Sequence, residues 1–250
     1  MTRKIFIIPT IFIIFVTVAV AQTNDDGGEA YNRGTQAAQA GNFRLAKMYY
    51  ETALDAVKRE KFGAPTVDEA KIRYNLGVCA FRVNNSAEAV KHLQQAIDLS
   101  GKKYQKAFYA LGMAETALEN WKAAREAFRS AINLKNDDGE AWFDLALVFV
   151  REKNYEDAAE AFRAAIKHGA SNIAASHNNL GVISAFGGDP NQAEREFQIA
   201  VSESEGKFAI ASRNLQILRA FLKNRQPELL AKLEINQSEN KSGEVKNNER

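Results

Sequence analysis

Few side chains in this sequence have the type and spacing that catalysis or metal binding requires. The 250 residues include three histidines, His92, His168 and His177, and a single cysteine, Cys79. Their spacing contains no HExxH or CxxC metal-ligand pair, and the chain has neither a glycine-rich phosphate loop nor a nucleophile elbow. We therefore expect a protein that is not an enzyme and that needs no metal or cofactor.

The remaining candidates for chemistry each have a structural explanation. One cysteine cannot form a disulfide within the chain, so Cys79 is either a redox-active thiol or, as we favour, a small buried apolar residue. Glu156 and Asp157 could act as an acid–base pair, but they lie at the expected start of a helix, where carboxylates stabilise the helix dipole. Gly187 and Gly188 indicate a turn rather than a phosphate cradle, because no strand precedes them.

The composition is that of a folded and nearly neutral protein. Apolar residues make up 46% of the chain and charged residues 26%, which is typical of globular domains. The net charge is +2, and Arg3 and Lys4 account for that excess. The rest of the chain is close to neutral, and its composition does not indicate the positive patch with which proteins bind nucleic acid or anionic membranes. We expect a protein or peptide partner and no nucleic acid.

The N-terminus has the order of a secretory signal peptide. Arg3 and Lys4 precede an apolar stretch, Ile5 to Val20, that ends in a small-x-small cleavage pattern at Ala21. The stretch is shorter than the roughly 20 apolar residues of a membrane-spanning helix. We expect cleavage after Ala21 and export to the periplasm or the medium. The alternative is a retained N-terminal anchor, and only an uncleaved segment would bring the chain to a membrane.

Small residues recur in the rest of the chain at intervals of 34 or 35 residues, after a first interval of 43. The first column of this repeat contains Gly34, Gly77, Gly112, Ala146, Gly181 and Gln216. Two further columns contain alanine: Ala46, Ala89, Ala124, Ala158 and Ala193, then Ala53, Ala96, Ala131, Ala165 and Ala200. Between them lies a column of large residues: Tyr50, Leu93, Phe128, Phe162 and Phe197. Small residues at these spacings allow two antiparallel helices, A and B, to cross closely and successive pairs to stack.

These columns resemble the tetratricopeptide repeat, whose 34-residue pattern is Trp, Leu-Gly, Tyr, Ala, Phe, Ala, Pro. The fourth unit matches with Trp142, Leu145-Ala146, Phe149, Ala158, Phe162 and Ala165. The resemblance implies an all-α, right-handed α-solenoid of about five helix-turn-helix units with a C-terminal capping helix. The chain departs from the pattern because no unit ends in Pro and because the long first interval requires an extra loop, placed at Lys61 to Val67.

The expected organisation has four parts. Residues 1–21 are the signal peptide, 22–28 a spacer, 29–224 the array of five repeats and a capping helix, and 225–250 a short helix followed by a disordered polar tail. In the last part, Leu229 to Ile235 could form one short amphipathic helix.

The resemblance also implies a partner-binding groove, because the A helices of such arrays line a concave face. One subgroup binds C-terminal carboxylates there, but only Asn75 and Lys106 match its five residues, against Tyr31, Thr35 and Ala110. We therefore expect no carboxylate clamp. The groove positions carry mainly apolar side chains: Tyr31, Tyr74, Val78, Phe81, Tyr109, Met113, Phe143, Leu147, Val150 and Val182.

If these side chains are exposed, their area matches or exceeds the largest apolar patches of ordinary monomers, and the groove should bind an apolar or amphipathic peptide. Alternatively, the rings are buried between adjacent A helices, or the chain's own segment Leu229 to Ile235 folds back as the ligand. We expect a non-enzymatic protein–protein interaction scaffold of the cell envelope. The alternative function is a module that binds glycan or peptidoglycan fragments by stacking on the aromatic rings.

Overall fold

The computed structural model describes residues 27–59 and 68–236. These residues form eleven α-helices and one 3-10 helix, with no strand among them. None of these helices is both long enough and apolar enough to cross a membrane. The predicted signal peptide, residues 22–26 of the spacer, the predicted loop at 61–67 and the tail from 237 lie outside the described residues.

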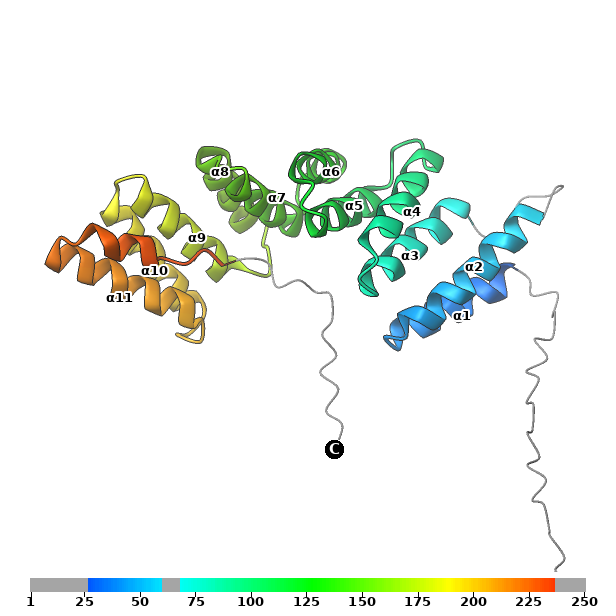
Figure 1. Cartoon of the computed structure of the whole chain (residues 1–250), viewed down its shortest axis with the longest axis horizontal. Helices are drawn as coiled ribbons and strands as arrows, with labels where there is room; N and C mark the ends of the chain where they lie inside the picture. The colour runs from blue at the N-terminus through cyan, green and yellow to red at the C-terminus, as the bar shows by residue number, and fades with distance from the viewer. Residues whose placement is uncertain (1–26, 60–67, 237–250) are drawn as a thin grey trace, which may run out of the picture.

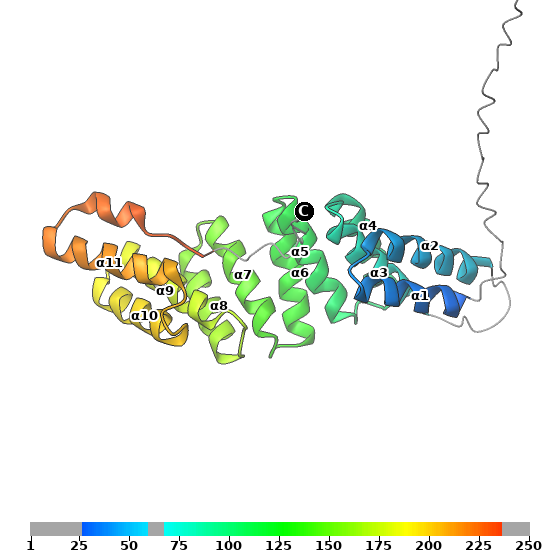
Figure 2. The same cartoon turned by 90° about the horizontal axis from the view of Figure 1, so that it is seen from below.

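The helices follow one another in antiparallel pairs that stack side by side into an elongated array (Figures 1 and 2). In chain order they are α1 (Gly27–Gln39), α2 (Phe43–Arg59), α3 (Glu69–Arg82), α4 (Ser86–Leu99), α5 (Gln105–Ala117), α6 (Trp121–Leu134), α7 (Gly139–Arg151), α8 (Tyr155–Lys167), α9 (Ile173–Phe186), α10 (Pro190–Glu203), α11 (Ala209–Asn224) and the 3-10 helix η1 (Pro227–Lys232). The odd-numbered helices are the predicted A helices, and the even-numbered helices are the predicted B helices. The predicted all-α solenoid of five pairs and a capping helix is confirmed.

The repeating small residues lie where the helices pack, as predicted. All ten alanines of the two alanine columns have no exposed surface. A methyl group added to Gly112 would lie 2.6 Å from the ring of Phe128, and one added to Gly181 would lie 2.6 Å from the ring of Phe197. The large residue of the B helix therefore lies directly over the glycine of the A helix, which explains why the two columns occur together.

Each turn from an A helix to a B helix contains one residue in the left-handed conformation. Gly41, Asn84 and Gly188 adopt it in the first, second and fifth units, as turn chemistry predicts. In the third and fourth units Glu119 and Lys153 adopt it instead. The asparagines that follow these two residues immediately precede the B helices α6 and α8. The turn geometry is thus shared by all units, although the residue that supplies it varies.

The C-terminal end of the array folds back on itself. After α11, η1 and the residues that follow it turn back along α11 towards α9 (Figures 1 and 2). The predicted helix over Leu229 to Ile235 is partly wrong, because helical structure ends at Lys232 and Leu233 is extended, with φ −68° and ψ 138°. The physical reason is that Glu234 and Asn236 bond to side chains of the array instead of to a helical turn.

Candidate functional site

A buried cluster of three asparagines holds this extended segment. Asn178 and Asn179 lie on α9 and Asn214 on α11, and all three have no exposed surface. Their side-chain amides face the main chain of residues 233–236, which we call the tail segment. Burying an amide is unfavourable unless its donor and acceptor are hydrogen-bonded, and here the tail segment supplies partners for all three. We call these residues the asparagine site.

The asparagine site binds the tail segment as a neighbouring β-strand would. Asn214 Nδ2 donates to the Glu234 carbonyl at 2.8 Å, and its Oδ1 accepts from the Glu234 N–H at 3.0 Å. Asn179 makes the same pair of bonds with Asn236, at 2.9 and 2.7 Å. The two bonded residues are two apart, which is the period of an extended chain. Asn178 Nδ2 adds a second donor to the Glu234 carbonyl, at 3.1 Å.

The side chains of the tail segment alternate between the array and the solvent. Leu233 is 8% exposed and belongs to a cluster that includes Val182 and Leu218. Glu234 points outward, where its carboxylate accepts a hydrogen bond from Arg213 Nη1 at 2.9 Å. Ile235 packs inward again, against the same cluster. The segment therefore has an aliphatic–acidic–aliphatic pattern, in which the two aliphatic side chains pack on the array and the acidic one between them points outward.

Two pockets adjoin the tail segment on the face of the A helices. One, of about 320 Å³, includes Tyr109, Met113 and Asn236 in its lining, and we call it the Tyr109 pocket. The other, of about 450 Å³, is lined in part by Leu147, Val150 and Ile235, and we call it the Leu147 pocket. These two pockets, together with the asparagine site, form the groove. The structure thus brings four of the predicted groove residues together, around the end of the tail segment.

Eight of the ten predicted groove residues are partly exposed, namely Tyr31, Tyr74, Val78, Phe81, Tyr109, Met113, Leu147 and Val150. The expected exposure of the other two, Phe143 and Val182, is wrong, since each is 1% exposed. Phe143 turns towards the B helix of its own unit and packs edge-on against Phe162, with ring centroids 5.6 Å apart. Val182 is covered by the cluster that contains Leu233. Whether the eight exposed side chains contact a partner remains a prediction.

The sequence left open whether the tyrosines predicted for the groove are exposed or buried between helices. In the structure their rings pack against neighbouring rings while part of each side chain stays exposed. Tyr74 packs against Tyr104 and Tyr109 against Phe128, with centroids 5.0 and 5.7 Å apart. The Tyr109 hydroxyl donates to Asp144 Oδ2 on α7 at 2.7 Å. Burial, and then the Asp144 carboxylate, raise the pKa of Tyr109 far above its usual value. Tyr109 is therefore a fixed wall of its pocket.

One hydrogen bond recurs between successive A helices. It joins the residue three positions before the first column to the residue two positions before that column in the next A helix. The pairs are Tyr31 with Asn75, Tyr109 with Asp144, and Asn178 with Asn214, at 3.0, 2.7 and 2.8 Å. The asparagine site was missing from the predicted groove because only the apolar residues of the first of these two columns were included, and the second column was compared only with the carboxylate clamp. Reading both columns on into α9 and α11 would have identified all three asparagines.

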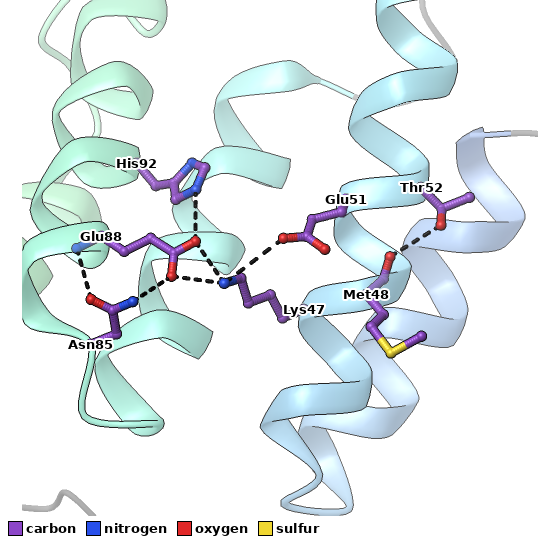
Figure 3. Close-up of polar contacts among 7 residues, drawn as sticks. All are labelled: Lys47, Met48, Glu51, Thr52, Asn85, Glu88 and His92. Atoms are coloured by element: carbon purple, nitrogen blue, oxygen red, sulfur yellow. Dashed lines mark hydrogen bonds and ion pairs between the residues drawn. The ribbon is translucent and has the colours of Figure 1, made fainter.

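A separate cluster of titratable groups lies between α2 and α4 (Figure 3). Lys47 Nζ lies 2.6 Å from Glu88 Oε1 and 3.8 Å from a Glu51 oxygen, and His92 Nε2 lies 3.8 Å from Glu88. Burial lowers the pKa of His92, so the ring is mainly neutral at pH 7. These contacts join the first two units, and we interpret them as an ion pair that supports stacking.

The remaining candidates for chemistry among the described residues are the single cysteine and any metal-binding cluster. Cys79 is buried, and burial raises the pKa of its thiol to about 11, which confirms it as an apolar core residue. Within the two described ranges, no group of three or more His, Cys, Asp or Glu side chains could hold a metal ion.

Comparisons with known proteins agree with this architecture. Two sequence models, each described as a tetratricopeptide repeat, match residues 28–102 and 109–173, which together exceed half of the chain. No curated protein matches the sequence.

Three similar solved structures cover most of the array. MamA from Desulfovibrio magneticus RS-1 has a TM-score of 0.63 and 17% identity, over 74% of this chain and 98% of that one. YrrB, described as a TPR protein with an unusual peptide-binding site, has a TM-score of 0.62 and 21% identity, over 77% and 93%. PilF from Pseudomonas aeruginosa has a TM-score of 0.62 and 17% identity, over 78% and 82%. At such identities the likeness concerns the fold.

Proposed function

The chain belongs to the tetratricopeptide repeat family, and from that premise we propose that it is a non-enzymatic interaction scaffold whose groove binds an extended, amphipathic segment of a protein partner. One observation carries this proposal: the groove already holds an extended segment, residues 233–236, through main-chain hydrogen bonds and alternating side chains. Main-chain bonds supply affinity in such recognition, and pockets for alternate side chains supply specificity.

The chemistry of the pockets defines the partner further. Leu147 and Val150 offer apolar surface in one pocket, while Glu140 and Asp144 place carboxylates beside Tyr109 and Met113 in the other. A partner segment would fill the first pocket with an aliphatic or aromatic side chain. It would place a polar or basic group beside the carboxylates of the second.

The proposed setting is the cell envelope. It is supported by the basic start, apolar stretch and cleavage pattern of residues 1–21. A protein exported in this way would hold other envelope proteins together, which is a task that needs a binding surface and no catalytic group. Family membership supports protein binding in general, and the setting rests on the N-terminal sequence.

A peptide fits the groove better than a glycan does. Sugars bind by stacking on the open face of an aromatic ring, with polar side chains beside it. Tyr74 and Tyr109 instead pack against Tyr104 and Phe128. The rest of the groove consists of pocket walls and of asparagine amides that bind the main chain of the tail segment.

Selection of binders from a displayed library of random dodecapeptides would test the proposal on the purified chain. We expect enriched peptides with apolar residues at alternate positions. The substitution Leu147→Glu puts a charge into the Leu147 pocket. It should raise the Kd of these peptides at least tenfold, as measured by fluorescence anisotropy. The matched control Ala87→Glu lies on the exposed first turn of α4 and should leave binding unchanged.

Two results would contradict the proposal. One is a set of peptides that bind Leu147→Glu as tightly as the unsubstituted chain, which would place binding outside the groove. The other is binding to a glycan array without any enriched peptide, which would favour the alternative module.

A further inference from the structure

The tail segment and the asparagine site belong to the same chain, so the segment can compete with a partner for the site. We propose that residues 233–236 are a tethered ligand that occupies the asparagine site, and that a partner segment of the same aliphatic–acidic–aliphatic pattern binds by displacing them. This inference rests on the proposed function and adds to it how the groove is regulated.

The bonds that hold the tail segment are available to any extended peptide. All five hydrogen bonds from the asparagine site go to the N–H and C=O groups of Glu234 and Asn236, and none to their side chains. A different peptide with the same backbone conformation would make the same bonds. The asparagine site therefore recognises an extended main chain rather than this particular sequence.

Selectivity comes from the side chains on either side of those bonds. The site buries Leu233 beside Leu218 and Val182, and it receives Ile235 at the rim of the Leu147 pocket. Between these two positions, the carboxylate of Glu234 accepts a hydrogen bond from Arg213. A competing segment therefore needs two aliphatic residues separated by an acidic one.

The connection to α11 leaves the tail segment free to detach. None of the residues of η1 is buried, and Leu233 is the only buried residue between Pro227 and Asn236. Segments with few buried contacts open at a lower free energy than the packed elements that they cover. Residues 227–236 can thus leave the site together while the helix pairs remain stacked.

The location of the tail segment makes displacement necessary for binding along the groove. Ile235 lines the Leu147 pocket and Asn236 lines the Tyr109 pocket, so the tail segment adjoins both pockets. A partner that reaches from either pocket to the asparagines must occupy the same space. A short tether gives the tail segment an effective concentration on the order of 1 mM, which would weaken a free peptide with a Kd of about 50 μM roughly twentyfold.

The test uses the full chain and a labelled synthetic octapeptide with the sequence of residues 229–236, Leu-Leu-Ala-Lys-Leu-Glu-Ile-Asn. Its Kd is measured by fluorescence anisotropy for the unsubstituted chain and for a chain with Leu233→Asp and Ile235→Asp. The double substitution removes the aliphatic contacts of the tethered copy and leaves the site intact. We expect the octapeptide to bind the substituted chain at least tenfold more tightly.

Two further variants identify the site and guard against unfolding. Adding Asn179→Ala and Asn214→Ala to the double variant should abolish the gain. Asn236→Pro removes the N–H group that donates to Asn179 Oδ1, while Leu233 stays in place. It should lower the Kd of the octapeptide by a few-fold. Circular dichroism checks that each variant keeps its helix content.

Equal affinity for the unsubstituted and the substituted chain would overturn the inference, because the tail segment would then not compete. Absence of binding to the folded variants would also overturn it, and would leave the tail segment as a permanent cap. In either case, library peptides that still need Leu147 would show that the proposed function stands without this control.

Discussion

The first four A helices, α1, α3, α5 and α7, differ from the last two, α9 and α11, in how they use the same positions of the repeat. The first group packs aromatic rings there, and the second binds a main chain through amides. Three positions before the first column, the earlier helices carry Tyr31, Tyr74, Tyr109 and Phe143, whereas α9 carries Asn178. Most of these rings pack onto the large residue of their own B helix. The amide of Asn178 instead faces the main chain of the tail segment. Exchange of a ring for an amide converts a packing position into a binding position.

The exchange keeps the contact between neighbouring units. The hydrogen bond from Tyr109 to Asp144 has its counterpart in the bond from Asn214 to Asn178. The Tyr109 hydroxyl has a single hydrogen, which it donates to Asp144 in the next A helix. An asparagine amide still has donor and acceptor capacity to spare, which the ligand main chain takes up. The repeat can therefore gain a peptide site without losing its stacking.

We call the aromatic positions of α1 to α7 the ring side of this comparison and the asparagine site the amide side. The largest expected loss of stability from a single substitution lies on the ring side. Phe143→Ala removes a buried ring that packs on Phe162, and should lower the free energy of unfolding by about 3–5 kcal/mol. Urea denaturation followed by circular dichroism measures the loss. The control Leu134→Ala removes an exposed side chain and should cost far less. A small loss for Phe143→Ala would mean that the ring is not part of the core.

A smaller effect is expected at the amide side. Asn214→Ala leaves the Glu234 N–H without its partner and the Glu234 carbonyl with only the bond from Asn178, and should cost about 1–3 kcal/mol. Hydrogen exchange should show faster exchange at the Glu234 amide, with the amides of α3 unchanged. Asn191→Ala on the exposed side of α10 is the matched control. Unchanged protection of Glu234 would contradict the bonding described for the asparagine site.

The two regions also differ in how far the sequence predicts them. The alanine columns predicted the buried residues of every unit, because close helix crossing requires small side chains at fixed spacing. The positions that face the groove were predicted less well. Spacing gives the helix face but not the direction of the side chain, so Phe143 and Val182 were placed on the surface. The path of the tail segment depends on three amides from two helices, and the repeat columns give the positions of these amides but not the main chain that they bind.

A pH-dependent effect should appear at Tyr109, one of the ring positions. The raised pKa of Tyr109, caused first by burial and then by Asp144, means that the folded chain keeps its phenol protonated at a pH where the unfolded chain releases the proton. This contribution is complete below the unfolded pKa of about 10 and declines above it. The stability advantage of the unsubstituted chain over Tyr109→Phe should therefore shrink by roughly 0.8 kcal/mol between pH 8 and 10.5. Thermal melts at both pH values measure the difference, and a constant advantage would contradict the burial of the hydroxyl.

The smallest expected effect concerns the charge pair that flanks the asparagine site. Arg213 and Glu234 are both about half exposed, so their attraction contributes only about 0.2–1 kcal/mol and is weakened by salt. Glu234→Arg should raise the rate of hydrogen exchange at residues 234 and 236 at low ionic strength, and adding Arg213→Glu should restore protection. The main-chain bonds are the same in all three chains, so this pair of substitutions isolates side-chain selectivity from backbone recognition. If the reversed pair fails to restore protection, Arg213 does not select an acidic residue, and binding at the amide side depends on the backbone and the aliphatic contacts alone.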